Sequence, residues 1–385
     1  MTDSLNIPVT HIITGLDTGG AEIMLKKLLQ AVDRDKYPSR VISLTTRGII
    51  GEQIAALGVP VTAMGMRPGR ISLADIGRLA GEIRDQKPDV VQTWMYHADL
   101  LGGLAARRVG VHWIAWNIRN STLDWKKSKP STLLTVSICS ILSHFIPRKI
   151  VVCSQAAARV HQQVGYAGWK MRVIPNGFDL AVFKPDQETG IKQRALLGLN
   201  RDVPVVGLAA RYDRQKDHET FFKSAAVVLQ SLPDTHFLLC GEGITPKNPV
   251  IRGWAAGTGR EEQFHLLGRW TDMPLFHAAC DVEVSSSAYG ESFSNVLGEA
   301  MACGIPCVST RVGGAEEVLG ETGQIVPPKN PEALGNAILT ILKQPATKRQ
   351  EMGMAGRERM LHNFDISLVA QEYSRVWNDM CNISA

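Results

Sequence analysis

The chain has 385 residues, of which 44% are hydrophobic and 21% are charged, and this composition is normal for a soluble globular protein. Its net charge of +5 favours anionic partners such as phosphates or an acidic membrane surface, but it is too small to indicate nucleic acid. No stretch is long and apolar enough to span a membrane, and no signal peptide is visible, so a cytoplasmic protein is predicted. The seven cysteines lack metal-binding spacing, and the length of the chain predicts about two domains.

Apolar runs alternate with amphipathic segments in the first half of the chain. Residues 7–16 predict a buried strand, which a glycine-rich turn joins to a helix over residues 18–32. Further strands are predicted at residues 40–46, 60–66, 89–95, 111–118 and 149–154, and helices at 51–58, 72–86, 98–110 and 156–166. This alternation is typical of a Rossmann-like domain with a parallel sheet.

Turn residues between positions 171 and 186 interrupt the alternation, and we place a domain boundary there. The pattern then resumes with strands predicted at residues 203–211, 235–243, 262–270, 280–287, 305–310 and 323–327. A long helix is expected over residues 361–380. The prediction is an α/β fold with one Rossmann-like domain at 1–175, a second at 176–362, and a C-terminal helix at 363–385.

An apolar stretch at residues 131–150 admits two interpretations. Basic residues flank it: Lys126, Lys127, Lys129, Arg148 and Lys149. It could be a helix packed on the first sheet, or a helix that lies on an anionic membrane surface. Its periodicity suits both, so the segment 126–149 is a candidate peripheral membrane contact.

Two glutamates eight positions apart, Glu291 and Glu299, stand in the stretch AYGESFSNVLGEAMACGIPCVST. In one continuous helix they would be separated by a rise of about 12 Å and a rotation of about 800°, on different faces. Paired glycosidase carboxylates need roughly 5–9.5 Å, so a hydrolytic acid/base pair is not predicted. The small polar residues instead predict a loop that carries Glu291, followed by a helix that starts near Ser294 or Asn295 and contains Glu299.

The start of that predicted helix is a candidate phosphate site. Backbone N–H groups and the helix dipole favour an anion there, and carboxylates on either side could accept hydrogen bonds from hydroxyl groups. A nucleotide-sugar has this layout, so we assign Glu299 to the ribose, Glu291 to the sugar, and Ser292, Phe293, Ser294 and Asn295 to the donor site. The alternative is that Glu299 is a solvated helix residue and Glu291 an ordinary loop acid.

Other strand ends supply groups suited to the same ligand. Arg211 and Lys216 follow the first strand of the second domain, where two cations could neutralise a departing diphosphate. Three further loops are expected to approach the donor, and they carry Gly241 and Gly243, Arg269 and Trp270, and Gly19 and Gly20 of the first domain.

With these motifs the whole chain resembles glycosyltransferase family 4. The resemblance rests on Glu291 and Glu299, on Arg211 and Lys216, on the segment IPNGFD at 174–179, on GIPCVSTRVGGAEEVL at 304–319, and on the Gly19–Gly20 turn. It implies a GT-B fold, in which two Rossmann-like domains face a central cleft and a C-terminal helix crosses back to the first domain. It also implies a nucleotide-diphosphate sugar donor, transfer with retention of configuration, and no metal or other cofactor.

One departure from the family concerns the first domain. Many members have a histidine after the fifth strand of this domain, whereas this chain has Asn117-Ile118-Arg119-Asn120 there. Arg119 or Asn117 could take over its contact with the reacting sugar. His97, which follows another strand of the same sheet, is the other candidate.

The predicted function is transfer of a hexose or N-acetylhexosamine, from a UDP-sugar by preference, to a saccharide acceptor. A lipid carrier for that acceptor is one option, and surface polysaccharide or lipopolysaccharide synthesis at the inner face of the membrane is the expected setting. The proposed catalytic residues are Arg211, Lys216, Glu291, His97 and Arg119. Three alternatives remain: a nucleotide-sugar epimerase or hydrolase, a nicotinamide-dependent enzyme, and a non-catalytic binding subunit. The first turn argues against the nicotinamide-dependent enzyme, because it lacks the GxGxxG spacing of that class.

Overall fold

The computed structural model describes residues 6–67, 72–121, 123 and 130–381. Its chain divides into two compact units: the first contains Met1–Gly177 and Ile366–Ala385, and the second contains Phe178–Asp365. The chain therefore leaves the first unit once and returns to it with its last helix. The unit limits differ by two and three residues from the boundaries predicted after residues 175 and 362.

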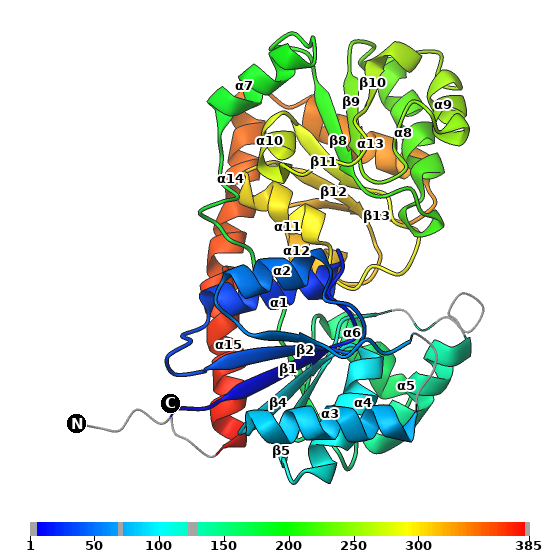
Figure 1. Ribbon diagram of the computed structural model, residues 1–385. Coiled ribbons are helices and arrows are strands. Elements are labelled where there is room, and N and C mark those ends of the chain that lie inside the picture. Colours follow the sequence, from blue (N-terminus) through cyan, green and yellow to red (C-terminus); the bar gives the residue numbers. More distant parts are fainter. Residues whose placement is uncertain (1–5, 68–71, 122, 124–129, 382–385) are drawn as a thin grey trace. The chain divides into compact units, whose positions relative to one another are not determined.

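Seven parallel strands form the sheet of the first unit, in the order β3-β2-β1-β4-β5-β6-β7 (Figure 1). They are β1 (Val9–Ile13), β2 (Ser39–Ser43), β3 (Val61–Ala63), β4 (Val90–Trp94), β5 (Trp113–Ile118), β6 (Lys149–Val152) and β7 (Met171–Val173). Because helices cover both faces, β1 and β4 are buried at every position, including the polar residues Thr10, His11, Gln92 and Thr93.

The helices of the first unit lie on both faces of its sheet (Figure 1). One face carries α1 (Gly20–Ala31), α2 (Gly48–Ala56) and the returning α15 (Ile366–Met380); the other carries α3 (Leu73–Gln86), α4 (Tyr96–Arg108) and α5 (Pro130–Leu142). The unit also contains α6 (Gln155–Gln163) and the short helix η1 (Gly168–Lys170).

Six parallel strands form the sheet of the second unit, in the order β10-β9-β8-β11-β12-β13. They are β8 (Val205–Ala209), β9 (His236–Cys240), β10 (Phe264–Leu266), β11 (Val282–Ser285), β12 (Cys307–Thr310) and β13 (Gln324–Val326). The helices are α7 (Gln187–Leu196), η2 (Arg214–Lys216), α8 (His218–Ser231), α9 (Pro249–Ala256), η3 (Glu261–Gln263), α10 (Met273–Ala278), α11 (Asn295–Ala302), α12 (Ala315–Leu319), α13 (Pro331–Leu342) and α14 (Ala346–Asn363).

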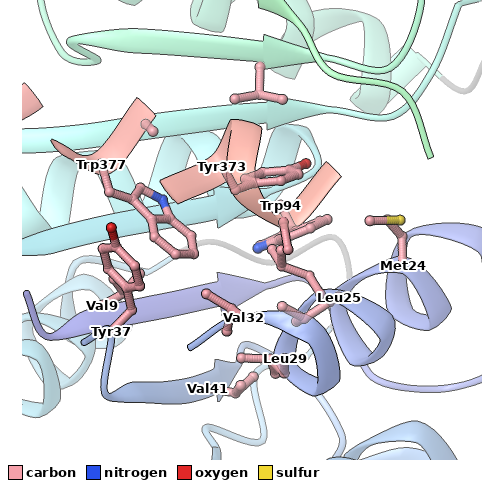
Figure 2. Packing of buried hydrophobic residues seen from close by; sticks show 14 of the residues in the cluster. Val9, Met24, Leu25, Leu29, Val32, Tyr37, Val41, Trp94, Tyr373 and Trp377 are labelled. Carbon is pink, nitrogen blue, oxygen red and sulfur yellow. The ribbon is translucent and has the colours of Figure 1, made fainter. Parts of the chain in front are cut away.

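The last helix completes the core of the first unit (Figure 2). Tyr373 and Trp377 of α15 are fully buried, and Tyr373 stacks on Trp94 of β4 with ring centroids 5.9 Å apart. The indole of Trp377 donates a hydrogen bond to Gln92 at 3.2 Å, and Tyr37 donates to Asn378 at 2.9 Å. A segment distant in sequence thus supplies both apolar area and hydrogen bonds to this unit.

The predicted α/β class with two Rossmann-like domains is confirmed by the two sheets. All strands within each sheet run parallel, so their carboxyl ends meet at one edge, and each strand order reverses direction beside its first strand. In open sheets of this kind, ligands bind in the crevice at that reversal point. Within the described residues, no helix is both long and apolar enough to cross a bilayer.

Candidate active site

The strand order of the second unit reverses between β8 and β11. A small pocket lies at their carboxyl ends, and its polar lining comes from Lys216, Ser285, Ser286, Ser287 and Ser294. The loop after β11 is tied to the loop after β8, because the Ser286 hydroxyl donates to the carbonyl oxygen of Lys216 at 2.8 Å and the Ala288 N–H donates to that of Gln215 at 2.8 Å. The structure therefore brings together the two loops that carry Lys216 and Glu291.

Lys216 and Glu291 form an ion pair at this pocket. The Lys216 Nζ atom lies 2.6 Å from Glu291 Oε2, and the two side chains are only 19% and 12% exposed. Ser287 donates a second hydrogen bond to the same carboxylate oxygen at 3.2 Å. A cation and a carboxylate are thus held in a sheltered position at the sheet edge, where electrostatic interactions are stronger than in open solvent.

Helix α11 starts next to this pair, as the sequence predicts. Ser294 is its N-cap residue, and its side chain makes no capping hydrogen bond. Glu299 lies one turn inside the helix, and Glu291 and Ser292 precede it. The ring of Phe293 is buried and lies 5.7 Å from that of Phe364, so a donor contact by this residue would involve its backbone.

Two glycines permit the close approach of loops around the pocket. Gly241 has a φ of +143°, and a Cβ atom there would lie 2.2 Å from the backbone oxygen of Ala210. Gly290 has a φ of +80°, and its Cβ atom would lie 2.1 Å from the side-chain amide of Gln215. A larger residue would force the loops after β8, β9 and β11 apart.

The remaining predicted donor residues of this unit lie on the same edge but are more exposed. Arg211 follows β8 and pairs with Asp213 at 3.4 Å, with its side chain 58% exposed. Arg269 follows β10 and pairs with Glu242 at 3.2 Å. Trp270, half-buried, donates from its indole to the carbonyl oxygen of Asp272, whose side chain caps α10.

A larger cavity lies at the opposite, amino edge of this sheet, lined in part by Val203, Asp281 and Pro306. Arg194 is its most buried cation, and it bonds Asp281 at 2.8 Å and the carbonyl oxygens of three residues. The guanidinium therefore holds chain segments together. The carboxyl edge, with its sheltered ion pair, is the better candidate for chemistry.

The first unit places the other predicted residues at its own carboxyl edge. Gly19 is the N-cap of α1, directly followed by Gly20, and His97 is the second residue of α4. Their preceding strands, β1 and β4, are neighbours at the reversal point of the sheet. His97 is half-buried, and burial lowers the pKa of its imidazole, which favours the neutral form.

Arg119 and Asn117 are engaged by the C-terminal helix. Arg119 donates to the Asn176 side chain at 2.8 Å and to the Tyr373 hydroxyl, and it lies over the ring of Trp94. Asn117 is fully buried and donates to the same Tyr373 hydroxyl at 2.9 Å. A direct substrate contact by Asn117, which we considered from the sequence, is therefore wrong, and Arg119 is in part a structural link between β5 and α15.

Two features near His97 had no clear signal in the sequence. Met95, between β4 and α4, has a φ of +72°, a strained value for a residue with a side chain, and its N–H donates to the Asn117 carbonyl oxygen at 2.9 Å. Asp99 is completely buried, and it accepts hydrogen bonds from the Thr93 hydroxyl and from the Asn117 N–H. Burial raises the pKa of Asp99 to about 8.

Replacing Asp99 by asparagine is expected to remove a pH dependence of stability. Below pH 4, roughly the pKa of an aspartate in the unfolded chain, the carboxyl is protonated in both the folded and the unfolded chain. As the pH rises from there toward 8, the unfolded chain releases this proton and the folded chain keeps it. The wild type should therefore lose free energy of unfolding across this window, by at most about 1.4 kcal/mol per pH unit. The asparagine side chain keeps an acceptor oxygen at this position but carries no charge.

Denaturant unfolding at several pH values between these limits would measure the effect. The matched control is Asp85→Asn, at a residue that is 77% exposed on α3. A wild type and an Asp99→Asn variant with parallel stability profiles would contradict the prediction.

A buried pair in the second unit was also not predicted. Glu283 of β11 and His277 of α10 are fully buried and lie 3.3 Å apart, and the other oxygen of Glu283 accepts from the Ala209 N–H at 3.2 Å. The glutamate thus holds the end of β8, directly before the loop with Arg211 and Lys216. The glutamate between two valines in the predicted strand CDVEVSSS was the available signal.

Comparisons with known proteins agree with this geometry. The family described as Glycosyltransferase Family 4 matches residues 18–182, and the family described as Glycosyl transferases group 1 matches residues 203–344. Together they span most of the chain.

Two similar proteins are named as glycosyltransferases. A UDP-Gal:alpha-D-GlcNAc-diphosphoundecaprenol alpha-1,3-galactosyltransferase of Escherichia coli is 26% identical over 60% of each chain. A GDP-mannose-dependent alpha-(1-6)-phosphatidylinositol monomannoside mannosyltransferase of Mycolicibacterium smegmatis is 29% identical over 50% of this chain and 52% of its own. This chain thus aligns with about half to 60% of their lengths. The crystal structure of Anabaena HepE with UDP and glucose superposes with a TM-score of 0.83 at 22% identity, covering 96% of this chain and 99% of that one.

The two matched families follow each other along the chain in the order of its two units, and the fold is that of GT-B glycosyltransferases. The chain belongs to glycosyltransferase family 4.

Proposed function

We propose that the chain transfers a hexose or N-acetylhexosamine from a nucleotide-diphosphate sugar to a saccharide acceptor. The observation that carries the proposal is the Lys216–Glu291 pair, which is sheltered at the reversal point of the second sheet beside the start of α11. This site offers a cation and backbone N–H groups for a diphosphate, and carboxylates for hydroxyl groups. A UDP-sugar is the preferred donor, since the E. coli relative is named for UDP-Gal and the Anabaena structure holds UDP.

The proposed chemistry rests on stabilising the departing diphosphate. Lys216, Arg211 and the first N–H groups of α11 would neutralise its growing negative charge. The acceptor hydroxyl would attack from the face that the diphosphate leaves, and a diphosphate oxygen would take its proton, so the sugar would keep its configuration. No metal takes part in this proposal, and activity in the presence of a chelator would test that point.

The acceptor proposed here is a saccharide on a lipid carrier. The names of both relatives support this, because one contains a diphosphoundecaprenol acceptor and the other a phosphatidylinositol monomannoside. The expected setting is surface polysaccharide or lipopolysaccharide assembly at the inner face of the membrane.

Calorimetry with UDP-glucose, UDP-galactose, UDP-GlcNAc and GDP-mannose, without metal, would test the donor site. One of these donors is expected to bind the wild type, and Glu299→Ala is expected to weaken binding by about tenfold or more. The physical reason is that each hydrogen bond between a charged group and a hydroxyl contributes about 1.5–3 kcal/mol.

A matched control is Glu188→Ala, which removes an exposed carboxylate paired with Lys192 on α7. Failure of all four donors to bind the folded wild type would overturn the proposal. A product assay without acceptor separates the hydrolase and epimerase alternatives, because only those enzymes would consume the donor rapidly.

A further inference from the structure

Helix α5 has apolar side chains on both its buried and its exposed side. Leu133, Val136 and Cys139 are buried, and the helix packs against α4. The opposite side continues into the following turn and carries a row of large apolar residues at spacings of three and four. These are Leu134, Ile138, Ile141 and Phe145, with exposures between 38% and 70%. The helix therefore packs against its own unit on one side and exposes apolar area on the other.

An exposed tryptophan extends this row. Trp169 in η1 is 74% exposed, and its ring lies 5.0 Å from that of His144, which itself lies 6.3 Å from Phe145. We call Leu134, Ile138, Ile141, Phe145 and Trp169 the α5 surface. Five clustered apolar side chains in contact with water mark an interaction site, because isolated ones are common but clusters are not.

Cations lie near the C-terminal end of α5. Lys170 donates to the carbonyl oxygens of Ser143, His144 and Pro147 at 2.7–2.9 Å, and Arg107 donates to that of Phe145 at 2.8 Å. Burial and the nearby charges of Arg107 and Arg148 lower the pKa of Lys170. Among the described residues, none of these three cations pairs with a carboxylate, so a positive field borders the α5 surface.

The positive charge of the sequence is concentrated in the segment that includes this helix. Residues 100–175 contain eleven lysines and arginines and one aspartate, a formal charge of +10, whereas the whole chain carries +5. The rest of the chain is therefore net acidic. Lys126, Lys127 and Lys129, which contribute to this count and to the membrane contact predicted at 126–149, lie outside the described residues.

We propose that the α5 surface docks on an anionic lipid bilayer. Leu134, Ile138, Ile141 and Phe145 would enter the boundary between headgroups and acyl chains, and Trp169 would lie at headgroup level, where tryptophan is favoured. Arg107, Arg148 and Lys170 would face the anionic headgroups. Charge complementarity favours a bilayer over a second copy of the chain, since two copies of this face would bring their cations together.

This inference deepens the proposed function, because it would bring the enzyme to a lipid-linked acceptor, but the surface itself is separate from the donor site. Co-sedimentation with vesicles of phosphatidylcholine alone, and of phosphatidylcholine with phosphatidylglycerol, tests it on the full chain. The wild type is expected to bind only the anionic vesicles, and less strongly as salt is added.

Two variants and a control locate the contact. The double variant Ile141→Ser/Phe145→Ser is expected to lower vesicle binding at least about tenfold, since two inserted apolar side chains are lost. Arg148→Gln should lower it about fivefold, the contribution of one cation near an anionic surface. The control is Leu196→Ser, which removes an apolar side chain that is 82% exposed on α7 of the second unit. This variant should bind the anionic vesicles as strongly as the wild type.

The outcomes separate the two proposals. Absence of wild-type binding to anionic vesicles at low salt, or equal binding by the double variant, would overturn the α5 surface as a membrane contact. Self-association that the double variant abolishes, without vesicle binding, would assign the surface to a second copy instead. Loss of donor binding in calorimetry with intact vesicle binding would overturn the proposed function and leave the docking surface.

Discussion

Replacing Lys216 by methionine is expected to lower the transfer rate by about 10²–10³-fold, the usual effect of removing one preorganised group that stabilises a developing negative charge. Methionine has a similar length and no charge. Lys216 is only 19% exposed and lies 2.6 Å from Glu291 Oε2, so its ammonium group has a defined position at the pocket. Its charge is therefore already in position when the diphosphate leaves, without the reorganisation that an exposed lysine would need.

The measurement is the initial rate of product formation with the donor that calorimetry identifies, analysed as kcat and KM. A group that acts on the departing diphosphate lowers kcat as well as kcat/KM, whereas a group that only binds the donor raises KM. Lys223→Met is the matched control, because Lys223 pairs with Glu219 on the exposed side of α8. If Lys216→Met folds normally and retains its kcat, the catalytic role of Lys216 is wrong.

Replacing Trp377 by alanine is expected to lower the stability of the first unit by about 3–5 kcal/mol. The indole is fully buried between Tyr37, Tyr373 and His11, with ring centroids 5.2–6.1 Å apart (Figure 2). Its N–H donates to Gln92, which is also fully buried. The variant therefore leaves a cavity and also leaves the side-chain oxygen of Gln92 without this donor.

Denaturant unfolding followed by hydrogen exchange in each unit would measure this effect. Because α15 belongs to the first unit, amides of β1 and β4 should lose protection while those of β8 and β11 keep it. Leu368→Ala on the same helix is the control, since Leu368 is 38% exposed, and it should cost no more than about 0.5 kcal/mol. Equal effects of the two substitutions would contradict a core role for α15.

The donor loops illustrate what local patterns predict well. The run CDVEVSSSAYGESFSNVLGEA predicted a strand, a polar loop and a helix starting near Ser294, and all three are present. Such features depend on residues close in sequence: apolar runs favour buried strands, and small polar residues favour loops and helix starts. The order of elements then placed Glu291 and Lys216 at one sheet edge, because parallel strands share that edge.

The contacts that define the site depend on residues far apart in sequence. The sequence assigned Lys216 to the diphosphate and Glu291 to the sugar of one ligand, but it did not predict that the two side chains pair with each other across 75 positions. Asn117 was a reasonable candidate near the end of its strand, yet its side chain is bonded to Tyr373 of the returning helix. Likewise, only the burial of Asp99 in the folded chain reveals that the pKa of its carboxyl is raised.

By itself, then, the sequence determined the alternation of strands and helices, the two-domain α/β fold and the motifs that mark family 4, because periodicity, turn residues and spacing are properties of neighbouring positions. Only the tertiary structure decided which polar groups are sheltered and what they contact. It buried Asn117 and Asp99, paired Lys216 with Glu291, and left Leu134, Ile141 and Phe145 in contact with water. Burial and pairing are set by the packing of elements brought together from distant parts of the chain, and packing also sets the local dielectric on which each charge depends.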